Sequence, residues 1–417
     1  MDMKQYIDSI PAVSSHEHIG SLSTVGMDPL AGFTADAHVG AACTQTGLET
    51  LLTECYTLAM LYGAGMPAGV TGPRLAQCYA RLRGTGFFQN HDRAYTRLYG
   101  VPLDAIFRDP EAWFEADAKI TKAYSAGLHA HTRDVLNKAN VERVCKPVQI
   151  SYLLDLKKGV ACPTEAASST PILRIDEICE FPFLLGPKAE LAREIYGIAP
   201  GTIDRMDQLI DLCFSLVDEL HIPAIKQLQA YFRTLRVNPV TRQEAKFALN
   251  AGDRITVQDY ALTRILEMAN QRNLPYQIHT GMTTQPDSSP MEMTPLFAKY
   301  PNVKFVLLHC YPYFSQCGLL AQLYGNVYAD CSWLAIVSPN LFETAIAEWI
   351  GYVPPGRICF SADATHVEQT YSSYSFMRDG LARVLEEKIA RGHMDENSAR
   401  LYAERLLRGN NLDLYFR

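Results

Sequence analysis

The sequence lacks the features that would direct a protein to a membrane, to an export pathway or to nucleic acid. No apolar run reaches the roughly 18 to 20 residues that a helix needs to span a bilayer. The N-terminal segment MDMKQYIDSIP has no basic, apolar and small-residue regions of the kind found in signal peptides. The net charge of -7 argues against nucleic acid as a partner, because phosphate binding needs a basic patch. We therefore expect a cytoplasmic protein that binds neither membranes nor nucleic acid.

Paired cysteines and low-complexity segments are also missing. The 11 cysteines are an odd number, are scattered, and include no Cys-x-x-Cys pair. We interpret them as reduced, mostly buried thiols, as is usual for a cytosolic chain. Long charge runs and short-period repeats are absent as well. The 417 residues, 48% of them hydrophobic, suffice for one large domain with insertions or for two domains.

The second half of the chain alternates short apolar segments with longer helical ones. The short segments are rich in β-branched or aromatic residues and follow turn signals: LPYQIHTG, NVKFVLLHCYP, GNVYADCSW and GRICFSADATH. The helical segments between them are SSPMEMTPLFAKY, YFSQCGLLAQLY and SPNLFETAIAEWIGY. Strands alternating with helices predict a parallel sheet, and the number of units favours a closed α/β barrel, (β/α)8 or TIM barrel, over an open sheet.

The middle of the chain fits the same pattern. VERVCKPVQISYLLD and ILRIDEICEF are predicted strands, and LHIPAIKQLQAYFRTLRV contains a strand that ends at Lys226. DRITVQDYALTRILEMANQRN predicts an amphipathic helix, and the C-terminal tail predicts two or more closing helices.

Residues 25–140 break this pattern because they contain helical segments and few strand signals. We therefore expect residues 1–24 to hold the first barrel strand with its metal motif. Residues 25–140 would be a helical insertion after that strand, and residues 141–417 the remainder of the barrel. The insertion could cap the pocket or contact a partner subunit, and we expect a homo-oligomer, either a dimer or a larger assembly.

The segment AVSSHEHIGS places His16 and His18 two residues apart directly after a short apolar run. On a helix, residues i and i+2 point roughly 200° apart, whereas on a strand they lie on the same face. If the apolar run ends a strand, both imidazoles can therefore reach one metal ion.

Other polar residues close the later strands, where a barrel places its active site. These residues are His279, His309, Asp330 and Asp363. Imidazole and carboxylate together suit zinc, manganese or iron(II), and an open coordination position would lower the pKa of a bound water to about 7. Asp363, within the small and apolar context CFSADATH, could take a proton from that water and pass it to a leaving group.

Each of these signals is weak when taken alone. A single His-x-His pair is a poor predictor of a metal site, an isolated His279 or His309 could be a hydrogen-bonded core residue, and Asp363 could cap the next helix. The sequence also contains a second pair at the same spacing, His129 and His131. That pair lies in a segment predicted to be helical, so its imidazoles should diverge. Only the combination of these residues at several strand ends is a specific signal of a metal site.

This combination resembles a known family. SSHEHIG, IHTGM, FVLLHCYP and CFSADATH are similar to the metal motifs of the amidohydrolase superfamily, amidohydrolase-2 type, whose nodulin/FluG-like members have relatives among decarboxylases and uronate isomerases. AIKQLQAYFRTLRV and ILRIDEI also resemble FluG-like segments. The resemblance covers about the first 25 residues and residues 140–417, and it does not specify a substrate.

The resemblance implies roles for individual residues. His16, His18 and His279 would be metal ligands, and Asp363 would contact the metal and handle the proton. His309 would be either a ligand or an electrophile that polarises the substrate. Lys226 lies where two-metal members carry a carbamylated lysine, but the following QLQAYFRT does not match that pattern. We therefore favour a single metal, with Lys226 neutralising charge or binding substrate.

Further residues are candidates for the substrate and for the barrel wall. Arg174, Tyr231 and Arg233 could bind a substrate carboxylate, which guanidinium groups grip in a bidentate manner. Glu17, the middle residue of the His-x-His motif, should point away from the metal into the barrel wall or toward a helix.

The leading functional hypothesis is a metal-dependent hydrolase of an amide or related C–N bond in a small polar metabolite. The alternatives are a non-oxidative decarboxylase of a small carboxylic acid, a uronate-isomerase-like enzyme, and a metal-stabilised scaffold that binds a partner through the insertion. The expected cofactor is one divalent transition metal, zinc in preference to manganese or iron.

Overall fold

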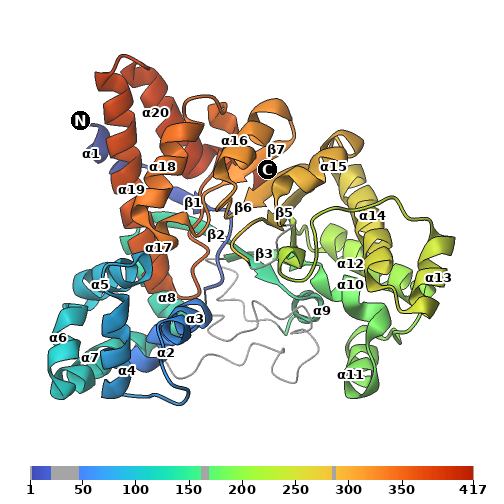
Figure 1. Cartoon of the computed structure of the whole chain (residues 1–417), viewed down its shortest axis with the longest axis horizontal. Helices are drawn as coiled ribbons and strands as arrows, with labels where there is room; N and C mark the ends of the chain where they lie inside the picture. Colours follow the sequence, from blue (N-terminus) through green and yellow to red (C-terminus); the bar gives the residue numbers. More distant parts are fainter. Residues whose placement is uncertain (1, 20–46, 161–168, 284–287, 417) are drawn as a thin grey trace.

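The structure, a computed structural model, describes residues 2–19, 47–160, 169–283 and 288–416. Its centre is a sheet of parallel strands, which helices surround (Figure 1). Within the described ranges, no helix combines the length and the apolar composition needed to cross a membrane.

Eight parallel strands form the sheet, and their order in space is their order in the sequence. They are β1 (Ala12–Ser14), β2 (Val141–Val148), β3 (Ser169–Arg174), β4 (Ile225–Gln227), β5 (Pro275–His279), β6 (Lys304–Leu308), β7 (Val327–Asp330) and β8 (Ile358–Cys359). Parallel neighbours need a crossover connection, which the helices between the strands supply. The predicted α/β barrel is confirmed.

Backbone hydrogen bonds join the residues after β1 to the residues after β8. The N–H groups of Ser15, Asp363 and His18 donate to the carbonyl oxygens of Phe360, His16 and Ala364, at 3.1, 3.1 and 2.9 Å respectively. The two segments that carry the first and last metal motifs therefore lie side by side, although almost the whole chain separates them in sequence.

Helices cover the outside of the sheet from β2 onward. They are α9 (Ile150–Lys157), α10 (Asp176–Glu180), η6 (Phe181–Phe183), α11 (Gly186–Tyr196), α12 (Ile203–Glu219), η7 (Gln229–Tyr231), α13 (Arg242–Ala251), α14 (Arg254–Arg272), η8 (Pro290–Met293), α15 (Thr294–Lys299), α16 (Phe314–Leu323), α17 (Leu334–Val337), α18 (Pro339–Trp349) and η9 (Pro355–Arg357). The chain begins with α1 (Met3–Ser9) and closes with α19 (Val367–Ala390), α20 (Glu396–Glu404), the π-helical η10 (Arg405–Gly409) and α21 (Asn410–Tyr415).

Local sequence signals explain where the longer helices begin and end. Thr241 and Glu244 form a capping box at the start of α13, so both satisfy backbone N–H groups that the helix leaves free. Asp253 caps α14, and Asn273 ends that helix with the left-handed φ of 55° that asparagine tolerates. These caps place β5, and therefore His279, directly after α14.

The regular elements described between β1 and β2 are all helical. The elements are α2 (Leu48–Leu52), α3 (Cys55–Gly63), α4 (Pro73–Tyr79), η4 (Ala80–Leu82), α5 (Gly86–Tyr99), α6 (Leu103–Arg108), α7 (Pro110–Ala123), η5 (Tyr124–Ala126) and α8 (Leu128–Lys138). Helices α2–α7 gather at the lower left of Figure 1 around a hydrophobic cluster of their own, and α5 and α8 pack on α19. The division into segments 1–24, 25–140 and 141–417 stays a prediction, and residues 20–46 of it lie outside the described residues.

Some predicted strand boundaries are wrong by a few residues. β1 ends at Ser14, so His16 and His18 lie in the extended segment just beyond it. β4 continues to Gln227, so Lys226 is an interior strand residue. The predicted strand ILRIDEICEF ends at Arg174, because Asp176 and Glu177 start a helix, where acidic residues interact favourably with the helix dipole.

Candidate metal centre

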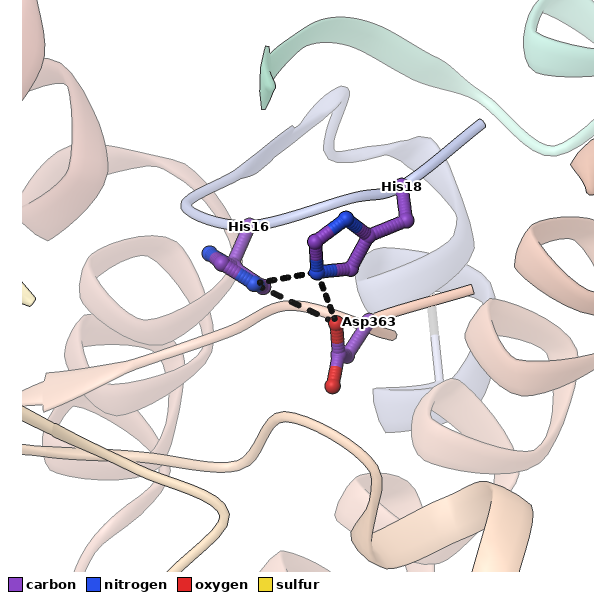
Figure 2. Close-up of side chains that lie close together, drawn as sticks. All are labelled: His16, His18 and Asp363. Carbon is purple, nitrogen blue, oxygen red and sulfur yellow. Dashed lines mark hydrogen bonds and ion pairs between the residues drawn. The ribbon is translucent and has the colours of Figure 1, made fainter. Parts of the chain in front are cut away.

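His16 and His18 point into the same space, as their spacing on an extended segment predicts. Figure 2 shows both imidazoles coming from one segment and turning their Nε2 atoms toward each other. These atoms are 3.2 Å apart, and the rings lie nearly perpendicular, at 83°. Both side chains are buried.

Asp363 completes this group from the other end of the chain. Its carboxylate Oδ1 lies 3.2 Å from Nε2 of His16 and 3.4 Å from Nε2 of His18 (Figure 2). The backbone of Asp363 has a left-handed φ of 59°, and its N–H donates to the carbonyl oxygen of His16. The close contact of the two segments therefore sets the distance between the carboxylate and the imidazoles.

The three ligand atoms fit a divalent metal ion. Edges of 3.2, 3.2 and 3.4 Å match a tetrahedron whose metal–ligand bonds are about 2.0 Å, the length typical of zinc with imidazole and carboxylate. The buried Asp363 Oδ1 has no hydrogen-bond partner in the described part of the chain. Such an unsatisfied buried oxygen is costly unless a ligand completes its contacts.

The protonation states also suit metal binding, which needs neutral imidazole and ionised carboxylate. Burial lowers the pKa of His18 well below its usual value. Burial opposes ionisation of Asp363, but the imidazoles of His16, His309 and His18 outweigh it and hold the pKa of Asp363 well below its usual range. Protons therefore do not compete with an ion at His18 or Asp363 at neutral pH.

Gln277 orients His16 and was missed by the sequence analysis. Nδ1 of His16 lies 2.7 Å from Oε1 of Gln277, so the ring proton sits on Nδ1 and the Nε2 lone pair is available for a metal. The amide nitrogen of Gln277 donates to the carbonyl oxygen of Ser15 and to the hydroxyl of Tyr415. The sequence did offer one indication of this role. Gln277 precedes His279 by two residues on β5 and therefore lies on the same face of the strand.

His279 and His309 lie beside the triangle formed by His16, His18 and Asp363. Their rings are 4.1 Å apart, and Nδ1 of His309 is 3.4 Å from Asp363 Oδ2. Within the described ranges, Nε2 of both residues is buried without a hydrogen-bond partner. Burial lowers the pKa of His279 well below its usual value and that of His309 to about 3. Both are therefore neutral, and the role of His279 as a metal ligand stays a prediction.

Several strand ends carry backbone strain. Five residues with left-handed φ follow β5, β6, β7 and β8: Met282, His309, Cys310, Trp333 and Asp363. Left-handed conformations are unfavourable for such side chains and persist where surrounding contacts impose them, often at functional sites.

Trp333 is a further residue at this site that the sequence analysis missed. Its ring lies 5.5 Å from the ring of His309 and 4.2 Å from that of Tyr56, which belongs to α3. Its buried indole N–H has no partner among the described residues. A lone tryptophan in CSWLA gave no signal of this position.

Lys226 and Arg174 bring positive charge to the same end of the barrel. They are paired in register on β4 and β3, and both are buried. Arg174 bonds Asp176 at 3.0 Å, whereas no ion pair within 4.0 Å joins the ammonium of Lys226 to a described residue. Burial lowers the pKa of Lys226 to about 8, while Asp363 favours its charged form.

The other two candidates for carboxylate binding occupy different surroundings. Tyr231, in η7, places its ring 4.3 Å from that of His279, at the edge of the site. Arg233 is almost fully buried and directs its guanidinium to Asp259, to Gln258 and to backbone carbonyl oxygens. These contacts fasten the loop after β4 to α14, so a substrate role for Arg233 stays a prediction without support from its contacts.

Asp330 and Glu17 hold the framework of the barrel. Asp330 ends β7, as expected, but its carboxylate accepts hydrogen bonds from Ser15, from Ser361 and from the N–H of Ser332, and burial raises its pKa. Glu17 points away from the imidazoles beside it, as expected. Its carboxylate accepts bonds from two backbone N–H groups and two hydroxyls, and burial raises its pKa to about 8.

The second His-x-His pair lies on a helix, as predicted, and does not join the triangle. His131 on α8 instead bonds the buried carboxylate of Glu368 on α19, at 3.0 Å. Glu368 also accepts bonds from Tyr99, Tyr124 and His366, and Nε2 of His366 contacts His91 at 3.2 Å. This network fastens the helices between β1 and β2 to the barrel.

Replacement of Glu368 by glutamine should lower the free energy of unfolding at pH 7 by about 3–5 kcal/mol, because it breaks a buried, multiply bonded carboxylate. Burial opposes ionisation, but the bonds from His131 and His366 hold the folded-state pKa of Glu368 below its usual range. The stabilisation is therefore complete above the unfolded-state pKa of about 4.3 and is lost as the pH falls below it.

Guanidinium unfolding at pH 7 and pH 4 would measure this difference. The difference in free energy of unfolding between the wild type and Glu368→Gln should be smaller at pH 4 than at pH 7. Glu386→Gln, on the exposed face of α19, is the control. Equal stability of Glu368→Gln and wild type at pH 7 would contradict the prediction.

Comparisons with known proteins agree with the metal motifs. The family model Amidohydro_2, described as amidohydrolase, matches residues 211–403. Protein fluG of Emericella nidulans is 34% identical over 153 residues, which are 35% of this chain and 18% of the fungal protein. The matched region therefore spans only a small part of that relative.

Solved structures with the same fold cover almost the whole chain. A uronate isomerase from Thermotoga maritima has a TM-score of 0.74 at 16% identity and covers 99% of this chain and 96% of its own. A glucuronate isomerase from Caulobacter crescentus has a TM-score of 0.72 at 14% identity, and the match covers 99% of this chain and 92% of the isomerase chain. A protein from Lactobacillus casei ATCC 334, proposed to be a metal-dependent hydrolase, has a TM-score of 0.68 at 16% identity. The match covers 99% of this chain and 97% of that protein's chain.

The amidohydrolase match and the fluG relative bear out the resemblance seen in the sequence motifs, and the solved structures share the barrel. Residues 211–403 of this chain match the amidohydrolase family.

Proposed function

We propose that this protein is a metal-dependent hydrolase that cleaves an amide or related C–N bond in a small polar metabolite. The observation that carries the proposal is the buried triangle of His16 Nε2, His18 Nε2 and Asp363 Oδ1, whose spacing suits one divalent ion. We assign zinc to this position, with manganese and iron(II) as alternatives. His279 is the proposed additional ligand from β5.

When bound, the ion would supply a water molecule of lowered pKa next to the triangle. Asp363 is ionised at neutral pH, so it can take a proton from the attacking water and return it to the leaving nitrogen as general base and then general acid. His309 lies on the Oδ2 side of Asp363, where it can polarise the substrate carbonyl.

Lys226 supports a substrate that carries a carboxylate. Its ammonium is buried beside neutral imidazoles, and its charge acts on His18, His279 and His309. A buried cation is costly unless an anion approaches it. The arrangement therefore favours an acidic metabolite, with Arg174, already bonded to Asp176, as a weaker second contact.

Replacement of Lys226 by methionine should lower kcat/KM for a carboxylated substrate about 10- to 100-fold, mainly through KM. This is the loss of one charge-assisted hydrogen bond, about 1.5–3 kcal/mol. The same substrate with a carboxamide in place of its carboxylate should respond much less. Steady-state kinetics on both compounds would measure this, with Lys304→Met, at the opposite end of the barrel, as the control. Equal losses of kcat/KM on the carboxylate and the carboxamide substrates would contradict carboxylate binding by Lys226.

Isomerisation of a sugar acid is the second candidate. It is favoured by the likeness to two structures named as uronate and glucuronate isomerases, each covering more than 90% of its own chain. A uronate also carries the carboxylate that Lys226 would bind. The same residues would hold an ion for this reaction, and the ion would polarise the substrate carbonyl while a hydrogen moves between two adjacent carbons.

A screen of the metal-loaded protein would separate the candidate reactions. Release of amine or ammonia from amides of small acids would support the hydrolase, and conversion between aldose and ketose forms of uronates would support the isomerase. Carbon dioxide from carboxylic acids would indicate the decarboxylase that the motifs also allow. Turnover of uronates without any amide hydrolysis would overturn the leading proposal.

The expected partner is a small molecule, and the amidohydrolase match over residues 211–403 supports this. We further propose a homo-oligomer in which the helices between β1 and β2 cap the pocket or contact a second subunit. The cytoplasmic location stays a prediction. Sedimentation of the purified protein would measure its oligomeric state.

A further inference from the structure

The carboxylate of Glu17 is bound to the loop that carries Asp363. The backbone N–H of Ala362 donates to its Oε1 at 3.0 Å, and the N–H of Ala364 donates to its Oε2 at 2.9 Å. Ser14 adds a hydroxyl bond to Oε1 at 2.7 Å, and Thr370 of α19 adds one to Oε2 at 3.3 Å. Glu17 is completely buried, and none of these four partners is a proposed metal ligand.

The two backbone donors flank a residue in an unfavourable conformation. Asp363 lies between them with a left-handed φ of 59°. Successive N–H groups around such a bend form a concave site that binds anions. Here the two oxygens of the Glu17 side chain accept these N–H groups, and the bonds compensate for the strain that the bend at Asp363 stores. The same bend directs the Asp363 carboxylate toward His16 and His18.

Backbone bonds reinforce this connection from the other strand segment. Asp363 N–H donates to the His16 carbonyl oxygen, and His18 N–H donates to the Ala364 carbonyl oxygen. Glu17 thus lies between His16 and His18 on one segment and accepts hydrogen bonds from both neighbours of Asp363 on the other. Its position links all three proposed ligands.

We infer that Glu17 is a positioning residue that fixes the Asp363 carboxylate opposite the imidazoles of His16 and His18. This inference rests on the metal site of the proposed function and explains the identity of the middle residue of His-Glu-His. Glutamine cannot substitute for it. Each carboxylate oxygen accepts one backbone N–H, so either orientation of an amide would place its NH2 group against a backbone donor.

Metal titration of Glu17→Gln tests the inference without relying on turnover. Stripped wild-type protein and variant would be titrated with Zn²⁺ against a chelating dye and with Co²⁺ followed by its visible absorption. We expect Glu17→Gln to bind both ions about 10- to 100-fold more weakly, as is typical when a group supporting a ligand is lost, and to show an altered Co²⁺ spectrum. Circular dichroism would establish that the fold is retained.

Glu177→Gln is the matched control. Glu177 on α10 is also a buried carboxylate, and it accepts a hydroxyl bond from Tyr196 and makes no contact with Asp363. Its replacement should leave metal affinity and the Co²⁺ spectrum unchanged. Wild-type affinity and spectrum in folded Glu17→Gln would overturn the inference, whereas a wild-type protein that binds neither ion would overturn the metal site itself.

Milder variants decide the question if Glu17→Gln does not fold. Thr370→Val removes one of the four donors to Glu17, and Glu17→Asp retracts the carboxylate from the backbone N–H groups. Both should weaken Co²⁺ binding, Thr370→Val by a few-fold and Glu17→Asp by more. Unchanged Co²⁺ affinity in both folded variants would overturn the inference.

Discussion

Simultaneous replacement of His16 and His18 by alanine should abolish metal binding and, with it, turnover. These residues supply two of the three buried ligand atoms that lie within 4.8 Å of one another, and the Asp363 carboxylate, even together with His279, should not retain a transition metal. Elemental analysis of the purified wild type should find about one equivalent of a divalent transition metal, as a single site predicts. The variant should contain essentially none.

The second His-x-His pair provides the control for this experiment. His129 has the same sequence spacing but lies on helix α8, away from the triangle, so His129→Ala should keep its metal. Added zinc should raise the melting temperature of stripped wild-type protein but not that of the double variant, because a ligand stabilises only the state that binds it. A double variant with wild-type metal content would exclude the triangle as the binding site.

Replacement of Asp363 by asparagine should lower kcat about 1,000-fold, within the range expected for a lost general base and acid. Asparagine keeps the shape of the side chain but can neither accept a proton from water nor donate one to a leaving nitrogen. The loss should persist at saturating metal, which separates proton transfer from the contribution of Asp363 to metal affinity. Kinetics across a metal titration, on the substrate that the screen identifies, would measure both effects.

Asp330 is the appropriate control, since it is another buried acid at a strand end. Its carboxylate is held by three serine residues and contacts none of the proposed ligands, so Asp330→Asn should reduce kcat far less. Metal-saturated Asp363→Asn with wild-type kcat would rule out proton transfer by this carboxylate. Metal content should be measured on the same samples.

Much of the architecture could be predicted because its signals are local. Alternation of short apolar segments with amphipathic ones indicates parallel strands and crossover helices, and each strand from β5 to β7 occurs where that pattern places it. The spacing of His16 and His18 indicates a shared face on extended chain, whereas the same spacing at His129 and His131 lies in a helical pattern. The structure agrees in both cases.

Other features could not be predicted because they depend on contacts between distant segments. Gln277 has no motif, and only its inward position on β5 brings it to Nδ1 of His16. Arg233 has a guanidinium that could bind a substrate carboxylate, but this group forms an ion pair with Asp259 on α14. Lys226 is an interior strand residue because β4 extends one position further than the pattern predicted.

The sequence by itself determined the repeating strand and helix pattern, the extended geometry of His-Glu-His, and the residue types that can bind a metal. These follow from periodicity and side-chain chemistry, which are properties of short segments. Only the tertiary structure decided that the segments after β1 and β8 pair, that Glu17 accepts N–H groups from both neighbours of Asp363, and that Lys226 lies in register with Arg174. Closing the barrel brings together residues almost 350 positions apart, and this proximity depends on the packing of all the strands between them.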